Sequence, residues 1–109
     1  MGFKPLARIL AYSYAGVEPH RMGIALAFAA PKALEKAGLD LEQMDLIEIN
    51  EAFAGQVLAV GAELDWNWDK VNVNGGAIAL GHSVGSSGCR IVVTLVHEMK
   101  CRSEQGDSI

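Results

Sequence analysis

The sequence has few cysteines, no long apolar run and no signal-peptide layout, and each absence excludes a class of protein. Its 109 residues include two cysteines, Cys89 and Cys101, which read as parts of one helix. Helical rise would separate them by roughly 18 Å, too far to pair, which favours a reducing compartment such as the cytoplasm. No stretch approaches the ~18 apolar residues of a membrane span. An organelle is the alternative location if a targeting segment lies outside this sequence.

Positive charge is also scarce. Thirteen acidic residues stand against nine basic ones, the net charge is -4, and no basic run appears. We therefore expect neither a nucleic-acid partner nor binding to an anionic membrane surface. An anionic ligand would have to be held by local devices such as helix N-termini, because the summed field of the chain would mildly repel it.

Half of the residues are hydrophobic, and their spacing predicts strands and helices in alternation within one domain. The expected strands are residues 6–17, 46–49 and 71–73, and the expected helices are residues 21–37, 52–64 and 86–100. Gly38 stands where a helix C-terminal cap belongs, and Pro31 predicts a break in the first helix. The second helix is expected to turn four apolar residues to one face: Phe53, Val57, Val60 and Leu64.

This order of elements predicts an α/β fold with a largely parallel sheet. Three strands make a thin sheet whose edges would stay unpaired. We therefore expect another segment or chain to supply further strands.

Two polar residues follow expected strands directly or through a loop. Asn50 comes after residues 46–49, and the loop that carries His82 comes after residues 71–73. Because ligands of open α/β sheets bind beyond the carboxyl ends of the strands, we expect the two residues side by side. An amide and an imidazole placed together can hold a water or a carbonyl oxygen, and a histidine can take a proton from a nucleophile.

The loop around His82 is dense in glycine. Its glycines are Gly75, Gly76, Gly81, Gly85 and Gly88. They would let the backbone approach a bulky ligand closely, although their spacing matches neither the Walker nor the dinucleotide pattern. A generic nucleotide or phosphate site is therefore a weaker alternative for this loop.

Two motifs resemble those of the thiolase family. Asn50-Glu51-Ala52-Phe53-Ala54 is similar to the family's NEAF motif, and the run from Gly75 to His82 is similar to its GGAIALGH motif. The similarity extends from about Lys4 to Lys100. It implies the C-terminal half of a thiolase, with a mostly parallel mixed sheet, helices, and no last strands. Residues 1–102 would form this partial domain and residues 103–109 a polar tail.

The resemblance also implies a chemistry. Thiolases make or cleave 3-ketoacyl-coenzyme A through an acyl-cysteine intermediate. The histidine matched by His82 activates the thiol, and the asparagine matched by Asn50 holds a water that completes the oxyanion site. Acyl-coenzyme A contacts are expected at four positions: Ala52, Phe53, Gly76 and Gly81. The expected substrates are coenzyme A thioesters, with no further cofactor and no metal, and thiolase-type contacts imply an oligomer.

Other features depart from the family. Its nucleophilic cysteine belongs to an N-terminal half that this sequence does not contain, and a second cysteine, in a C-x-G motif, has no match here. The chain alone is therefore expected to be inactive and to need that half as a partner. Ser83 stands where a proline is usual, which predicts a less rigid histidine loop. A non-catalytic thiolase-like module that acts in chain association is the alternative function.

Several of these residues could instead have purely structural roles. Asn50 could cap the following helix, and Glu51 could support that helix's first turn through the dipole. His20 and His97 are expected at a surface turn and on a helix face, without a metal. Cys89 and Cys101 read as small helix residues.

Overall fold

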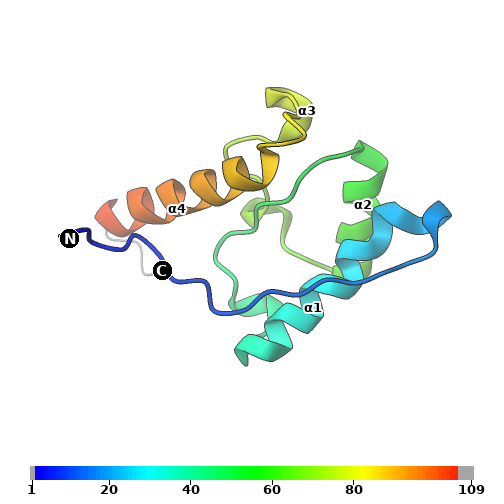
Figure 1. Cartoon of the computed structure of the whole chain (residues 1–109), viewed down its shortest axis with the longest axis horizontal. Helices are drawn as coiled ribbons and strands as arrows, with labels where there is room; N and C mark the ends of the chain where they lie inside the picture. Colours follow the sequence, from blue (N-terminus) through cyan, green and yellow to red (C-terminus); the bar gives the residue numbers. More distant parts are fainter. Residues whose placement is uncertain (1, 106–109) are drawn as a thin grey trace.

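The computed structural model describes residues 2–105, and these form helices joined by extended segments (Figure 1). The α-helices are α1 (Ala25–Ala37), α2 (Ala54–Leu64), α3 (Ala77–Leu80) and α4 (Ser87–Gln105). Three short 3-10 helices accompany them: η1 (Pro19–Ile24), η2 (Leu41–Gln43) and η3 (Trp68–Lys70). None of the helices described is long and apolar enough to cross a membrane.

The expected three-stranded sheet does not form within residues 2–105, which corrects the predicted sheet-rich α/β architecture. A single parallel bridge joins Ile47 to Val71. Its two hydrogen bonds run from Ile47 N to the Lys70 carbonyl and from Asn72 N to the Ile47 carbonyl, each 2.8 Å long. Residues 46–49 and 71–73 therefore run parallel, as expected, but they form a single bridge and not a sheet.

Asn72 explains why this pairing stops. Its φ of 47° is left-handed, so the backbone leaves the strand direction there. The side chain then takes the place of a strand neighbour, because its Oδ1 accepts from Ile49 N at 2.8 Å and its Nδ2 donates to the Ile49 carbonyl at 3.0 Å. The Asn72 side chain thus forms hydrogen bonds with both the backbone N–H and the carbonyl of Ile49, without a second strand bridge.

The predicted strand at residues 6–17 is likewise not assigned as a strand. The segment before η1 runs as an extended thread past α1 (Figure 1). Lys36 of α1 holds it at one point, donating from Nζ to the Tyr12 carbonyl at 3.3 Å. A strand needs a neighbour to satisfy its backbone, and no neighbouring strand accompanies this segment within the described residues.

Helix α1 differs from its prediction at the start and in the middle. The first residues, from Pro19 to Ile24, form the 3-10 helix η1, and Pro31 lies inside a continuous α-helix and does not break it. A proline there removes only its own hydrogen bond, to the carbonyl of Ala27, and Ala27 is anchored in the core. The predicted cap is confirmed: Gly38 has φ 69° and its N–H bonds Glu35 O, while Leu39 N bonds Leu34 O. This pair of bonds is a Schellman ending.

The core lies where α1 and α2 pack together with η1. Its buried members are Ala27, Ile49, Val57, Val60 and Trp66. Val57 and Val60 confirm the predicted inner face of α2. Phe53 does not share it, because α2 begins one residue later and the Phe53 side chain is 69% exposed.

Gly61 lets α2 meet the two tryptophans closely. A Cβ at this position would lie 2.7 Å from Trp66 Nε1 and 2.7 Å from a ring carbon of Trp68. The two indoles are perpendicular, with ring centroids 5.5 Å apart. Only a residue without a side chain fits against this pair.

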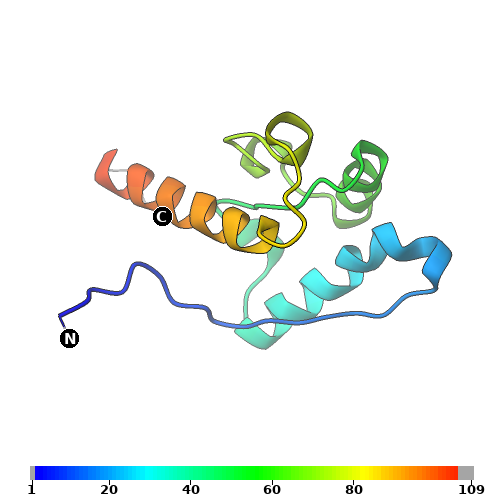
Figure 2. The same ribbon diagram turned by 45° about the horizontal axis from the view of Figure 1, so that its top comes forward.

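Helix α4 lies apart from α1 and α2 in both ribbon views, with the extended segments between them (Figure 2). It extends past the predicted end at residue 100 and takes in residues 103–105 of the expected tail. The (i, i+4) ion pair between Glu98 and Arg102 supports this continuation. Residues 106–109 of the expected tail lie outside the described residues. The glycine-rich loop also contains an unpredicted turn of helix, α3.

Candidate active site

His82 lies in the short segment between α3 and α4, and its imidazole is held from one side. Its Nδ1 is 2.7 Å from the hydroxyl of Ser87, which begins α4 and is only 3% exposed. Within residues 2–105, Nε2 has no hydrogen-bond partner, and the residue as a whole is exposed. One ring nitrogen is thus anchored in the protein and the other is available to a ligand or a reacting group.

The first turns of α4 fasten the rest of the histidine loop. Arg90 donates from Nη1 to the Gly81 carbonyl at 2.7 Å. The Ser83 carbonyl accepts from the backbone N–H groups of Ser86 and Ser87, each at 2.8 Å. The loop therefore has direct bonds to α4 on both sides of His82, and these restrain it although Ser83 lacks the φ restraint of a proline.

Asn50 is half-buried and has an unsatisfied oxygen. Its Oδ1 is inaccessible and has no partner in the described structure. A buried amide oxygen needs a donor, and a water is the usual one where the chain supplies none. The plainer reading of Asn50 as a helix cap is wrong, because α2 has Phe53 at its N-cap and no side-chain cap bond.

Glu51 joins the asparagine segment to the glycine-rich loop. Its carboxylate accepts from Asn72 Nδ2 at 3.0 Å and from the backbone N–H of Ile78, in α3, at 2.9 Å. The expectation that Glu51 supports the first turn of its own following helix is thus wrong, since it serves α3 instead. Its bonds fix the segment after Asn50 against the start of the helical turn that leads to His82.

The predicted glycine contacts divide into two kinds. Gly76 is buried, and a Cβ there would lie 2.5 Å from both carboxylate oxygens of Glu51. Close packing of Gly76 against the site is thus explained by Glu51. Gly81 has φ 91°, in the region that favours glycine, and open space beside it. Ala52 and Phe53 are both exposed.

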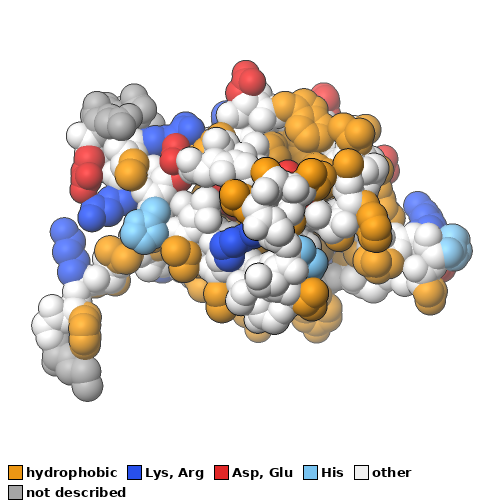
Figure 3. Space-filling view, turned by 90° about the horizontal axis from the view of Figure 1, so that it is seen from above, with side chains coloured by type: hydrophobic (Ala, Val, Ile, Leu, Met, Phe, Trp, Pro, Cys, Tyr) orange, Lys and Arg blue, Asp and Glu red, His pale blue; other side chains and the backbone are white. Residues whose placement is uncertain are grey.

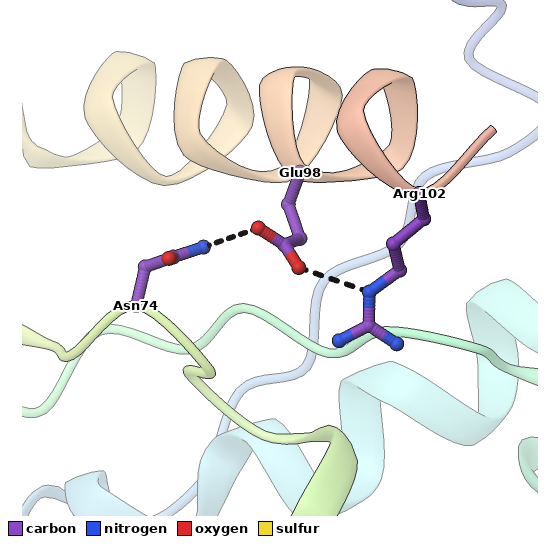
Figure 4. Close-up of polar contacts among 3 residues, drawn as sticks. All are labelled: Asn74, Glu98 and Arg102. Carbon is purple, nitrogen blue, oxygen red and sulfur yellow. Dashed lines mark hydrogen bonds and ion pairs between the residues drawn. The ribbon is translucent and has the colours of Figure 1, made fainter. Parts of the chain in front are cut away.

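A polar cluster ties α4 to the loop that leads into the site (Figure 4). Asn74 donates from Nδ2 to Glu98 Oε2 at 2.8 Å, and Arg102 donates from Nε to Glu98 Oε1 at 2.9 Å. The hydrogen bond from Asn74, and then that from Arg102, lower the pKa of the Glu98 carboxyl. Burial raises the pKa of Glu48 nearby, against the attraction of Arg90.

Sequence reasoning missed four residues that hold the site: Asn74, Ser87, Arg90 and Glu98. A serine at the start of the expected helix 86–100 is the signal that could have pointed to Ser87. Asn74 and Glu98 pair across a long sequence separation that no local pattern marks.

The bond from Ile78 N to Glu51 connects the segment of Asn50 with the helical turn that precedes His82. That the side chains of Asn50 and His82 lie side by side stays a prediction. Two hollows of about 260 and 390 Å³ lie elsewhere, along η2 and its surroundings. Over the face seen from above α3, hydrophobic side chains are abundant (Figure 3). The large exposed hydrophobic residues near α2, in α3 and in the histidine loop include Phe53, Ile78, Leu80 and Val84. Within residues 2–105, no group of histidine, cysteine and acidic side chains is arranged to hold a metal.

Comparison with known proteins identifies the family. Residues 3–107 match the family model described as the thiolase C-terminal domain. The chain belongs to the thiolase family. The solved acetyl-CoA acetyltransferase of Bacillus anthracis superposes with a TM-score of 0.91 at 57% identity, covering 94% of this chain and 26% of that one. The fold is thus that of a thiolase C-terminal domain.

Other relatives agree. Acetyl-CoA acetyltransferase of Pseudomonas aeruginosa is 63% identical over 99 residues, covering 91% of this chain and 25% of the relative. Human mitochondrial 3-ketoacyl-CoA thiolase superposes with a TM-score of 0.90 at 56% identity, covering 93% of this chain and 26% of that one. The chain therefore spans about a quarter of the length of these thiolases.

Proposed function

We propose that this chain is the C-terminal part of a thiolase-type acyltransferase that condenses or cleaves 3-ketoacyl-coenzyme A through an acyl-cysteine intermediate. The nucleophilic thiol comes from the N-terminal half that the chain needs as a partner. His82 acts as the base, and Asn50 holds the water of the oxyanion site. The names of the relatives, acetyl-CoA acetyltransferase and 3-ketoacyl-CoA thiolase, support this chemistry.

The observation that supports the proposal is that His82 has one ring nitrogen anchored and the other free, and the unsatisfied amide oxygen of Asn50 adds to it. His82 is held at Nδ1 and free at Nε2, so Nε2 can take the thiol proton and later return it. The Asn50 amide holds a water whose hydrogen points to the developing negative charge of the substrate, and its Oδ1, which has no partner within residues 2–105, supports this role. Proton transfer and charge stabilisation thus fall to two different residues.

The substrate surface follows from the same framework. Ala52 and Phe53 are exposed beside Asn50 and contact the pantetheine and acyl parts. Gly81 leaves open space next to His82 for the substrate. Gly76 acts by admitting the Glu51 carboxylate, which sets the spacing of the two segments.

The test replaces the matching segment of the Pseudomonas relative with this chain and measures thiolysis of acetoacetyl-coenzyme A. We expect the chimera to turn over, His82→Ala to lower kcat by at least ~100-fold, and Asn50→Ala to lower it by roughly 10²–10³. His97→Ala is the matched control, because that histidine is exposed on α4 and outside the site. Equal rates for the His82→Ala and His97→Ala chimeras would refute the proposal.

Association is the second candidate function, and the exposed apolar surface favours it. Large hydrophobic side chains stand open on the N-terminal thread, such as Leu6 and Ile9, and on α4, such as Val92 and Val93. Apolar surface of this extent marks contact with other chains. We propose that the missing thiolase half and a second protomer cover it. Analytical ultracentrifugation of the purified chain showing only monomer at high concentration would contradict the self-association.

The free cysteines bear on location. Cys89 and Cys101 are both exposed and unpaired, as is usual for proteins of reducing compartments. We propose the cytoplasm for the parent enzyme. Fractionation of the native host, followed by detection with an antibody to α4, would test this.

A further inference from the structure

Ser87 contacts two groups of the histidine loop at once. Its hydroxyl oxygen lies 2.7 Å from His82 Nδ1 and 3.1 Å from the Ser83 carbonyl oxygen. The residue is only 3% exposed, so the protein supplies these two partners in place of bulk water. Both distances are those of hydrogen bonds.

The single hydrogen of a hydroxyl decides how the two contacts are arranged. A carbonyl oxygen can only accept, so the contact with Ser83 is a bond only if Ser87 donates its hydrogen there. The contact with His82 is then a bond only if Nδ1 carries a hydrogen and donates it to Ser87. The opposite arrangement would leave two acceptor oxygens facing each other at 3.1 Å in a buried place, which is unfavourable.

We propose that Ser87 is a positioning residue that fixes neutral His82 as its Nδ1–H tautomer, so that Nε2 carries the lone pair. The tautomer of a histidine is set by the hydrogen bond that its other nitrogen makes. Neutral histidine in water favours the Nε2–H form, so Ser87 reverses the ordinary preference. A base that acts through Nε2 requires this reversal, and in that respect the inference rests on the proposed function.

The arrangement has a further mechanistic value. When Nε2 takes up a proton, Nδ1 keeps its hydrogen and its bond to Ser87, so no loop bond has to break. The Ser83 carbonyl also keeps its bonds from the backbone N–H groups of Ser86 and Ser87. The neutral and cationic rings therefore occupy the same place, and proton transfer needs little reorganisation.

The tautomer can be read directly from the ring nitrogens. Long-range ¹H–¹⁵N correlation spectra of the uniformly labelled chain, taken at an alkaline pH, distinguish a protonated nitrogen from a bare one. His82→Gln assigns the His82 signals, and His20 and His97 serve as internal references. We expect His82 to show a protonated Nδ1 and a bare Nε2.

Variants separate the hydroxyl from the fold. Ser87→Ala should turn the majority of His82 to the Nε2–H form and leave the other two histidines unchanged, while Ser87→Thr restores the hydroxyl and the Nδ1–H form. Ser86→Ala is the matched control, because the Ser86 hydroxyl is 3.4 Å from the same carbonyl and does not bond the imidazole. It should keep the wild-type pattern.

Two results would overturn the inference. One is a majority Nε2–H form in the unaltered chain, which decides the matter even if Ser87→Ala fails to fold. The other is a folded Ser87→Ala chain with the wild-type tautomer. Since the spectra need no turnover, an inactive chimera would refute the proposed function and leave this assignment standing.

Discussion

Adding one methyl group at Gly76 should destabilise the protein through a single neighbour. The backbone at Gly76 has φ -123°, which any residue adopts, so alanine brings no backbone strain. Its Cβ would, however, lie 2.5 Å from both carboxylate oxygens of Glu51. That carboxylate cannot swing aside freely, because Asn72 and Ile78 each donate a hydrogen bond to it.

The loss of stability follows from the hydrogen bonds that the Glu51 carboxylate would lose. Moving it breaks one or both bonds, and leaving the partly buried Asn72 donor without its partner costs about 1–3 kcal/mol, similar to the cost of overpacking a core. We expect Gly76→Ala to lower the free energy of unfolding by about 1–3 kcal/mol. Each kcal/mol corresponds to a fall in Tm of about 4–8 °C for a domain near this size.

A double-mutant cycle with Glu51 isolates the mechanism. Glu51→Ala removes the obstructing carboxylate, so Gly76→Ala should cost less than about 0.5 kcal/mol in that background. Urea unfolding followed by the fluorescence of Trp66 and Trp68 measures both steps. Gly55→Ala is the control: nothing lies within 4 Å of its would-be Cβ, and alanine in α2 should stabilise by about 0.5–1 kcal/mol. An equal cost of Gly76→Ala in both backgrounds would refute the reasoning.

Three further changes test other parts of the framework. Asn72→Ala removes the side chain that pairs with Ile49 and should cost about 1–3 kcal/mol in urea unfolding. Asn72→Asp should cost at least as much, because its second carboxylate oxygen would face the Ile49 carbonyl and the Glu51 carboxylate without a hydrogen to donate. Gly61→Ala should destabilise by about 1–3 kcal/mol and shift the tryptophan emission, because the new methyl meets both indoles. The lowered pKa of Glu98 stabilises the fold above pH 4.5, and this contribution is lost as the pH falls through the lower folded value. The urea midpoint of Asn74→Ala should therefore fall less on acidification than that of the unaltered chain, and a parallel fall in both would contradict the assignment.

Local signals were sufficient to predict α1, α2 and α4 and the residues at which α1 and α2 end. Gly38 marks the end of α1 because a left-handed cap depends on a few adjacent residues. Val57 and Val60 were found by helical spacing alone. The motifs were equally informative for the family, which residues 3–107 confirm.

Features that depend on contacts between distant residues could not be predicted from the local sequence. Residues 6–17 have the composition of a strand, but pairing needs a neighbour that composition cannot supply. Pro31 was expected to break α1, yet tertiary packing of that helix overrides the local preference. The bond from Ile78 to Glu51 could not be predicted, because no local pattern marks two residues so far apart in sequence as neighbours.

Helix α4 behaves as a rod attached at two points. Its first turns hold the loop of His82, and Glu98, roughly 17 Å further along the axis, holds Asn74. A sliding or rolling movement of the rod would carry the imidazole with it and strain the distant attachment. The position of the His82 imidazole is therefore sensitive to substitutions around Glu98, about three turns further along the helix.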